Sequence, residues 1–162
     1  MTSAAQANRG QYMTSGVPAL DTVLGGGIPK GASVFICGLP GAGKTVLSEQ
    51  ALFANARRSE SVLYVTTLSE PPVKLLRFSR SFEFFRPELL ERNVRYADVG
   101  DALRSGGPAA CLEELSALLQ QHRPDFLVLD SFKVFREHFE EDRTFRAFVA
   151  EVMILFATWE VT

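Results

Sequence analysis

The chain has 162 residues, the usual size of one globular domain, and its 46% hydrophobic content argues against a disordered protein. The formal net charge of −2 provides no overall basic field for non-specific nucleic-acid binding, although a local basic patch stays open. No apolar run approaches the roughly 20 residues that span a bilayer, and the N-terminal residues lack the apolar stretch of a secretory signal, so we expect a cytoplasmic protein without a membrane partner.

The chain begins with small and polar residues. We expect residues 1–13 to be a flexible lead-in to a domain that covers residues 14–162. A short helix with Pro18 in its first turn is predicted next, and the glycines at 25–27 end it. Residues 28–31 then turn the chain into the first strand.

A glycine-rich loop of the form G-x-x-x-x-G-K-T follows, between a predicted strand over 33–37 and a predicted helix over 43–58. Glycines let the backbone pass close to an anion, so successive N–H groups can surround phosphate oxygens at the start of a helix. We expect Lys44 to reach the β- and γ-phosphates and the Thr45 hydroxyl to bind Mg²⁺. The loop therefore predicts binding of ATP with Mg²⁺ through Gly38, Leu39, Pro40, Gly41, Ala42, Gly43, Lys44, Thr45 and Val46.

Strands and helices alternate through the rest of the chain. This order is typical of right-handed crossovers and of a mostly parallel sheet flanked by helices, so the predicted fold class is α/β. The strands are short apolar runs, and the helices carry apolar residues at helical spacing. Predicted strands cover 61–66, 94–99 and 125–130, and predicted helices cover 71–85, 108–122 and 143–159.

An aspartate ends the most apolar of these strands. Asp130 follows the run Phe126-Leu127-Val128-Leu129, and in a parallel sheet the carboxyl ends of the strands form the edge where ligands bind. A buried strand must end in a polar residue in any case, so the pattern alone also fits an ordinary strand end. Together with an upstream phosphate loop, it predicts that Asp130 helps to hold Mg²⁺.

Hydrolysis of ATP also needs a group that orients the attacking water. Glu70 follows the second strand at the same predicted edge, and we assign it a catalytic role beside Lys44. The alternative is a glutamate that is favoured by the dipole of the helix beginning near Pro71. Asp98 ends the third strand and is a second candidate, which we expect to be solvated instead.

A longer motif precedes the phosphate loop. It consists of Thr14-Ser15-Gly16-Val17-Pro18-Ala19-Leu20-Asp21 and Leu24-Gly25-Gly26-Gly27-Ile28-Pro29-Lys30-Gly31. With Ser15 inserted or substituted, the motif resembles the lead-in to the ATPase core of KaiC-like proteins. These proteins belong to the RecA superfamily, which also includes the RadA-type recombinases. The resemblance continues through 63–66 and the pair Asp130-Ser131, and so covers the chain from about Thr14 onward.

The resemblance implies a RecA-like P-loop ATPase, in which residues 38–45 hold the triphosphate and Asp130 lies on the Mg²⁺ side. It also implies a ring hexamer whose neighbouring subunits complete each active site. The family usually has adjacent glutamates after the second strand, whereas this chain has Leu68-Ser69-Glu70 there. That departure puts efficient hydrolysis in doubt, but not ATP binding, and nothing in the chain implies autokinase activity.

The resemblance also bears on the end of the chain. Family members continue into a further core strand that lies between the phosphate-loop strand and the strand of Asp130. This chain stops at Thr162, where that strand would begin. We therefore expect a C-terminally truncated domain with an incomplete core and a gap beside the strand over 125–130.

Three functions are compatible with these features. The leading interpretation is an ATP-hydrolysing, KaiC-like regulatory or signalling module with protein partners. Arginines interleaved with phenylalanines over 77–95 would suit single-stranded nucleic acid, as in a RadA-like DNA repair ATPase, but phenylalanines facing the core and solvated arginines are the favoured explanation. A nucleotide-binding scaffold that does not hydrolyse ATP is the third.

Overall fold

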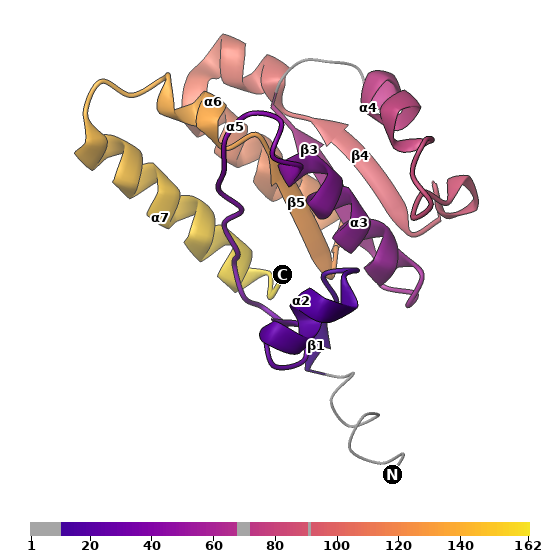
Figure 1. The fold of residues 1–162 in the computed structure, drawn as a ribbon. Coiled ribbons are helices and arrows are strands. Elements are labelled where there is room, and N and C mark those ends of the chain that lie inside the picture. Colours follow the sequence, from indigo (N-terminus) through magenta and orange to yellow (C-terminus); the bar gives the residue numbers. More distant parts are fainter. Residues whose placement is uncertain (1–10, 68–71, 91) are drawn as a thin grey trace.

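The structure is a computed structural model that describes residues 11–67, 72–90 and 92–162, and for residues 72–75 it describes the backbone alone. A central parallel sheet lies between layers of helices, with a small two-stranded sheet near the N-terminal end (Figure 1). The elements in chain order are β1 (Tyr12–Met13), α2 (Pro18–Val23), β2 (Ile28–Pro29), α3 (Lys44–Ala56), β3 (Val62–Thr66), α4 (Pro72–Ser79), the 3-10 turn η2 (Pro87–Leu89), β4 (Val94–Asp98), α5 (Gly100–His122), β5 (Phe126–Asp130), α6 (Lys133–Arg136) and α7 (Asp142–Thr158).

Three parallel strands form the central sheet, in the order β4-β3-β5. The middle strand β3 pairs along its whole length, with Tyr64 opposite Tyr96 of β4 and opposite Val128 of β5. Every residue of β3 is buried, which explains its nearly continuous apolar sequence. The predicted α/β class, with a parallel sheet flanked by helices, is confirmed.

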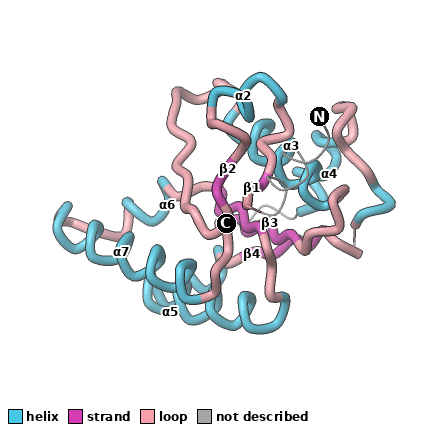
Figure 2. The backbone as a smooth tube through the Cα atoms, turned by 90° about the horizontal axis from the view of Figure 1, so that it is seen from below, coloured by secondary structure: helices cyan, strands magenta, loops and turns pink. Residues whose placement is uncertain are grey.

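Each face of the sheet carries its own hydrophobic core. The helices α5 and α7 lie side by side on one face, and Leu63 and Val65 of β3 point into the core beneath them (Figure 1 and Figure 2). The helix α3 covers the other face, where Phe53 packs in one cluster with Val62 and Tyr64. Alternate side chains of β3 therefore serve opposite cores, as the pleat of a strand requires.

Two helices differ in length from their predictions. α4 ends at Ser79 rather than near 85, and the chain then turns so that Phe85 is buried without being helical. α5 begins at Gly100 rather than at 108 and is kinked at Gly107, whose φ and ψ are 71° and −164°. Pro108 is the first residue of the second half of α5, where a proline costs no helical hydrogen bond. α5 therefore consists of two helical segments, whereas the sequence predicted only the second.

The predicted strand over 33–37 is wrong. Residues 32–39 belong to no sheet, and the side chains of Val34, Phe35 and Ile36 are 58%, 56% and 42% exposed. The segment has the β-branched and aromatic composition of a strand, but a strand forms only where a neighbour can accept its backbone hydrogen bonds. Within the described residues, no strand pairs with it.

A groove of about 1020 Å³ lies beside this unpaired segment. Residues 32–38 line one side and the strand β5 lines the other. Thr162 reaches one end of it, where its N–H donates to Asp125 O at 3.1 Å and its carbonyl accepts from Leu127 N at 2.8 Å. This is the hydrogen-bond pattern of a parallel strand pair. The groove lies where the sequence analysis expects a gap beside β5.

The motif before the phosphate loop is a network of hydrogen bonds around Asp21. Its carboxylate accepts from the Thr14 hydroxyl at 2.5 Å and from Ser15 N at 2.7 Å. Buried Asn55 of α3 then donates to Thr14 O and accepts from Thr14 N. Gly16 has a φ of +76°, and a Cβ there would lie 2.8 Å from Gln50 O, which explains the glycine. The motif therefore fixes the lead-in against α3.

Asp21→Ala should lower the free energy of unfolding by roughly 1–2 kcal/mol at neutral pH, because two donors lose a charged acceptor. Burial alone would raise the pKa of Asp21, but hydrogen bonds from Ser15 and Thr14, with Arg58 nearby, hold it below its ordinary value of 3.8. The folded-state pKa is thus the lower one. The stabilisation by Asp21 is complete at pH values above its unfolded-state pKa. It is lost as the pH falls through its folded-state pKa.

Urea denaturation at several pH values checks this prediction. The difference between wild type and Asp21→Ala should be full near neutral pH and should shrink below about pH 4. Asp101→Ala, which removes an exposed carboxylate from α5, serves as the matched control and should change little. A difference for Asp21→Ala that stays constant into acid would contradict the prediction.

Candidate functional site: a phosphate loop facing a strand-end aspartate

The phosphate loop lies between the unpaired segment and the first turn of α3. Gly43 caps α3 in the left-handed backbone region, with a φ of +84° and open space where a Cβ would lie. The dihedral angle, and not crowding, is therefore what favours glycine here. Among the described residues no side chain caps this helix. The N–H groups of its first turn remain available to an anion.

Lys44 is folded back over the loop. Its Nζ donates to Gly38 O at 3.0 Å and to Leu39 O at 2.9 Å. Neutral carbonyls are weaker partners for an ammonium group than phosphate oxygens. A triphosphate in the loop would offer Lys44 stronger acceptors without requiring the helix to move.

Asp130 and Thr45 meet at the carboxyl end of β5, although 85 residues separate them in the sequence. The Thr45 hydroxyl donates to Asp130 Oδ2 at 2.8 Å. The same oxygen accepts from the Tyr64 hydroxyl at 2.7 Å. Burial, reinforced by the Asp130 carboxylate, raises the pKa of Tyr64, so its hydroxyl keeps its proton and stays a donor.

Two of these three residues, Thr45 and Asp130, are predicted from the sequence. Tyr64 was missed, because a tyrosine in a β-strand is typical of a hydrophobic core. The usable signal is its register: it lies on the α3 side of β3, two residues before the edge where Asp130 ends the neighbouring strand. A hydroxyl at that position can reach a carboxylate at the end of the adjacent strand.

The two acidic candidates beyond Asp130 have different outcomes. Glu70 lies outside the described residues, so its catalytic role stays a prediction. Asp98 ends β4, and its Oδ1 accepts from Gly100 N at 2.6 Å at the start of α5. It therefore satisfies a backbone donor at the start of a helix.

Comparison with known proteins identifies the family. The family described as "ATPase: KaiC" matches residues 13–162. The chain belongs to the KaiC ATPase family. The resemblance drawn from the sequence is thereby confirmed, and the domain is a P-loop ATPase domain of the RecA superfamily.

Several curated proteins are similar to this KaiC-family chain. A UPF0273 protein of Pyrobaculum aerophilum is 37% identical over 98 residues, covering 60% of this chain and 34% of the relative. The DNA repair protein RadA of Synechocystis is 31% identical over 133 residues, covering 79% of this chain and 25% of the relative. The circadian clock oscillator protein KaiC of Parasynechococcus marenigrum is 26% identical over 136 residues, covering 79% of this chain and 27% of the relative. The chain thus spans about a quarter to a third of the length of these relatives.

The donor set of this KaiC-family site suits Mg²⁺. Mg²⁺ prefers oxygen ligands and is usually held by one or two protein groups together with phosphates and water. A hydroxyl and a carboxylate 2.8 Å apart beside the phosphate loop match that preference. In the described part of the chain, no group of three or more His, Cys, Asp or Glu side chains could hold a metal without phosphate. Nor does that part contain a helix long and apolar enough to cross a membrane.

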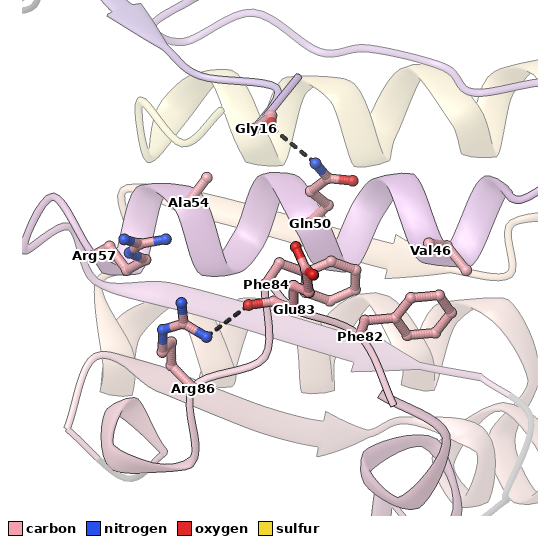
Figure 3. A pocket seen from close by; sticks show the side chains of 9 residues that line it. All are labelled: Gly16, Val46, Gln50, Ala54, Arg57, Phe82, Glu83, Phe84 and Arg86. Carbon is pink, nitrogen blue, oxygen red and sulfur yellow. Dashed lines mark hydrogen bonds between the residues drawn. The ribbon is translucent and has the colours of Figure 1, made fainter. Parts of the chain in front are cut away.

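A second hollow, of about 530 Å³, runs along the outer side of α3 (Figure 3). One wall is formed by Val46, Gln50 and Ala54 of the helix and by Arg57 just after it, and the turn after α4 forms the other. Arg86 of that turn donates to Glu83 O, so its guanidinium is partly engaged with backbone.

The phenylalanines of this region divide between the core and the surface. Phe85 is buried and Phe84 packs against the core under α3, whereas Phe78 is 53% exposed. Phe82 is half-buried, and its ring stacks on that of Phe84 with centroids 5.2 Å apart. Core packing thus accounts for Phe84 and Phe85, whereas Phe78 lies at the surface. The phenylalanines of the α6 region also pack in the core, with Phe135 0% exposed and Phe132 and Phe139 against it.

Proposed function

We propose that this chain binds MgATP and hydrolyses it as a KaiC-like regulatory or signalling module. The observation that carries the proposal is the meeting of Thr45 and Asp130 at the mouth of the phosphate loop. Two oxygen ligands from distant parts of the chain converge beside a loop and helix start whose N–H groups can hold phosphate. This arrangement is what a nucleotide-bound Mg²⁺ requires.

Each residue then has a distinct part in the reaction. The loop N–H groups and Lys44 bind the phosphates, and Lys44 offsets the charge that develops on the γ-phosphate. Thr45 and Asp130 would hold Mg²⁺, which would offset the negative charge of the phosphates when bound. Glu70 orients water for in-line attack. From the resemblance to KaiC-like proteins, we further propose a cytoplasmic ring hexamer, in which a neighbouring subunit completes each site.

Glu70→Gln tests the catalytic assignment. We expect ATP turnover to fall roughly 10²- to 10⁴-fold, because an amide cannot take up a proton from the attacking water. Affinity for MgATP should stay close to that of wild type, since a water-orienting group contributes little to phosphate binding. Phosphate release and nucleotide binding are measured on the same preparations. Turnover at the wild-type rate would remove Glu70 from the mechanism.

Two measurements distinguish this proposal from other functions. A wild-type protein that binds ATP but releases no phosphate would be a nucleotide-binding scaffold. The similarity to RadA, which covers 79% of the chain, supports a second candidate function, that of a RadA-like DNA repair ATPase. That function predicts binding to single-stranded DNA that is salt-dependent and strengthened by ATP. Fluorescence anisotropy with a labelled single strand, with and without ATP, measures it.

A further inference from the structure

A buried carboxyl group on α3 has no part in the reaction proposed above. Glu49 lies one helical turn after Thr45, on the side of α3 that faces the sheet, and it is 0% exposed. Burying a carboxyl group costs free energy unless the group is neutral or fully hydrogen-bonded. A leucine would fill the same position without that cost, so Glu49 needs a specific explanation.

The partner of Glu49 is the last residue of α4. Ser79 Oγ lies 2.7 Å from Glu49 Oε1 and 2.7 Å from Oε2, and Ser79 is also 0% exposed. A hydroxyl carries one proton, so it can donate to one of these oxygens and accept from the other. Burial raises the pKa of Glu49, and a protonated carboxyl group would supply the second proton. A buried pair of groups thus joins α3 to α4.

The pair continues as a row of side chains that ends at the nucleotide site. The Tyr96 hydroxyl donates to Glu49 Oε1 at 3.4 Å, and its ring stacks on that of Tyr64 with centroids 5.3 Å apart. Tyr64 in turn donates to Asp130. We call these five residues the polar row: Asp130, Tyr64, Tyr96, Glu49 and Ser79. It runs from the carboxyl end of β5 across the middle of β3 and β4 and finishes on α4.

We propose that Glu49 is a positioning residue of the ATPase: through Ser79 it holds α4 in a fixed place relative to α3 and Asp130. The inference rests on the proposed function. α4 has only 8 residues and begins at Pro72, shortly after Glu70 in the sequence. A short helix moves as a unit, so holding its last residue limits where its first turn can lie.

The apolar side chains of α4 that the structure describes, at residues 76 and 78, differ in burial. Leu76 packs partly buried against the core under α3, but Phe78 is 53% exposed. Within the described side chains, the buried pair of Glu49 and Ser79 joins the last residue of this helix to α3. Reaction rates are sensitive to displacements of about 1 Å in groups that place the reactants, so a loosened α4 should slow the reaction.

Variants of the full chain separate a positioning role from a structural one. Glu49→Leu removes the contacts to Ser79 but keeps the core filled. It relieves the cost of burying a carboxyl group while the hydroxyls of Ser79 and Tyr96 lose an acceptor, so we expect the variant to stay folded. We expect its ATP turnover to fall roughly tenfold to a hundredfold, with the affinity for a non-hydrolysable MgATP analogue unchanged. Glu49→Gln keeps one oxygen acceptor and one N–H donor for Ser79, and it should restore most of the turnover.

Ser79→Ala tests the pair from its other side. It should slow turnover as Glu49→Leu does, and the double variant should be no slower than either single one, because the two residues act as a unit. Ser81→Ala is the matched control, since Ser81 is exposed and its hydroxyl donates only to Phe78 O within the described structure. It should turn over ATP like wild type.

Hydrogen exchange of the α4 amides keeps this inference separate from the proposed function. Without nucleotide, Glu49→Leu and Ser79→Ala should speed exchange in α4 relative to wild type, and Glu49→Gln should not. This result does not depend on hydrolysis, so a wild type without ATPase activity would overturn the proposed function alone. The role of Glu49 would be overturned if the α4 amides of Glu49→Leu exchanged as slowly as those of wild type. It would also be overturned if the α4 amides of Glu49→Gln exchanged as fast as those of Glu49→Leu.

Discussion

Lys44→Ala is expected to weaken ATP binding by at least about tenfold and to lower ATP turnover by about a hundredfold or more. The ammonium group supplies charge-assisted hydrogen bonds to the phosphates, and its contribution grows as charge develops on the γ-phosphate. Both effects have the same origin, so affinity and rate should fall together. Titration with a fluorescent ATP analogue and measurement of phosphate release give the two quantities.

The structure also predicts that Lys44→Ala leaves stability nearly unchanged. In the described residues, Lys44 Nζ donates only to two loop carbonyls at the surface, Gly38 O and Leu39 O. Those carbonyls can turn to water when the ammonium group is removed. The melting temperature without nucleotide should therefore match that of wild type.

Lys30→Ala is the matched control for Lys44→Ala. Lys30 is a partly exposed lysine paired with Glu60 at 3.1 Å and takes no part in the phosphate loop. Its replacement should leave nucleotide binding and turnover at wild-type levels. A Lys44→Ala protein that binds ATP as tightly as Lys30→Ala would contradict the assignment of the phosphate loop.

Asp130→Asn should remove the dependence of ATP binding on Mg²⁺ and lower turnover by roughly a hundredfold. The amide keeps the shape of the side chain but not its negative charge, and it presents a single oxygen to the hydroxyls of Thr45 and Tyr64. Wild type should bind ATP more tightly with Mg²⁺ than with a chelator, and the variant should show little difference. Isothermal titration calorimetry under both conditions measures this.

Tyr64→Phe separates the charge of Asp130 from its hydrogen bonds. It removes the donor at 2.7 Å from Oδ2 and leaves the carboxylate in place. Mg²⁺ dependence should persist, and turnover should change by about tenfold or less, as expected for one supporting hydrogen bond. If Tyr64→Phe lost Mg²⁺ dependence as fully as Asp130→Asn, the assignment of the metal side to Asp130 would be wrong.

The parts of the site that the sequence predicts well are those that local chemistry determines. The loop around Lys44 follows from glycine dihedrals and from a helix start. Asp130 follows from an apolar strand with a polar end. Both signals lie within a few consecutive residues. The family motif around Asp21 is equally local, and the structure shows what it does: its carboxylate organises the lead-in that Asn55 ties to α3.

The predictions that failed, and the residues that were missed, depend on contacts between distant segments. Residues 33–37 have the composition of a strand, but pairing is decided by a neighbour that lies far away in the sequence. The roles of Tyr64 and Glu49 arise from partners 66 and 30 residues away. Nothing in the local sequence marks Glu49 as buried, because a glutamate in a helix is usually solvated.

The unpaired segment before the phosphate loop has an energetic consequence for ligand binding. Only one side of the loop is anchored to regular structure, at α3, while residues 32–39 carry no backbone ladder to order the other side. Part of the free energy of phosphate binding must then offset the conformational entropy lost when the loop is ordered. Any segment that pairs with residues 33–37 would order the loop in advance and so tighten nucleotide binding without touching the nucleotide.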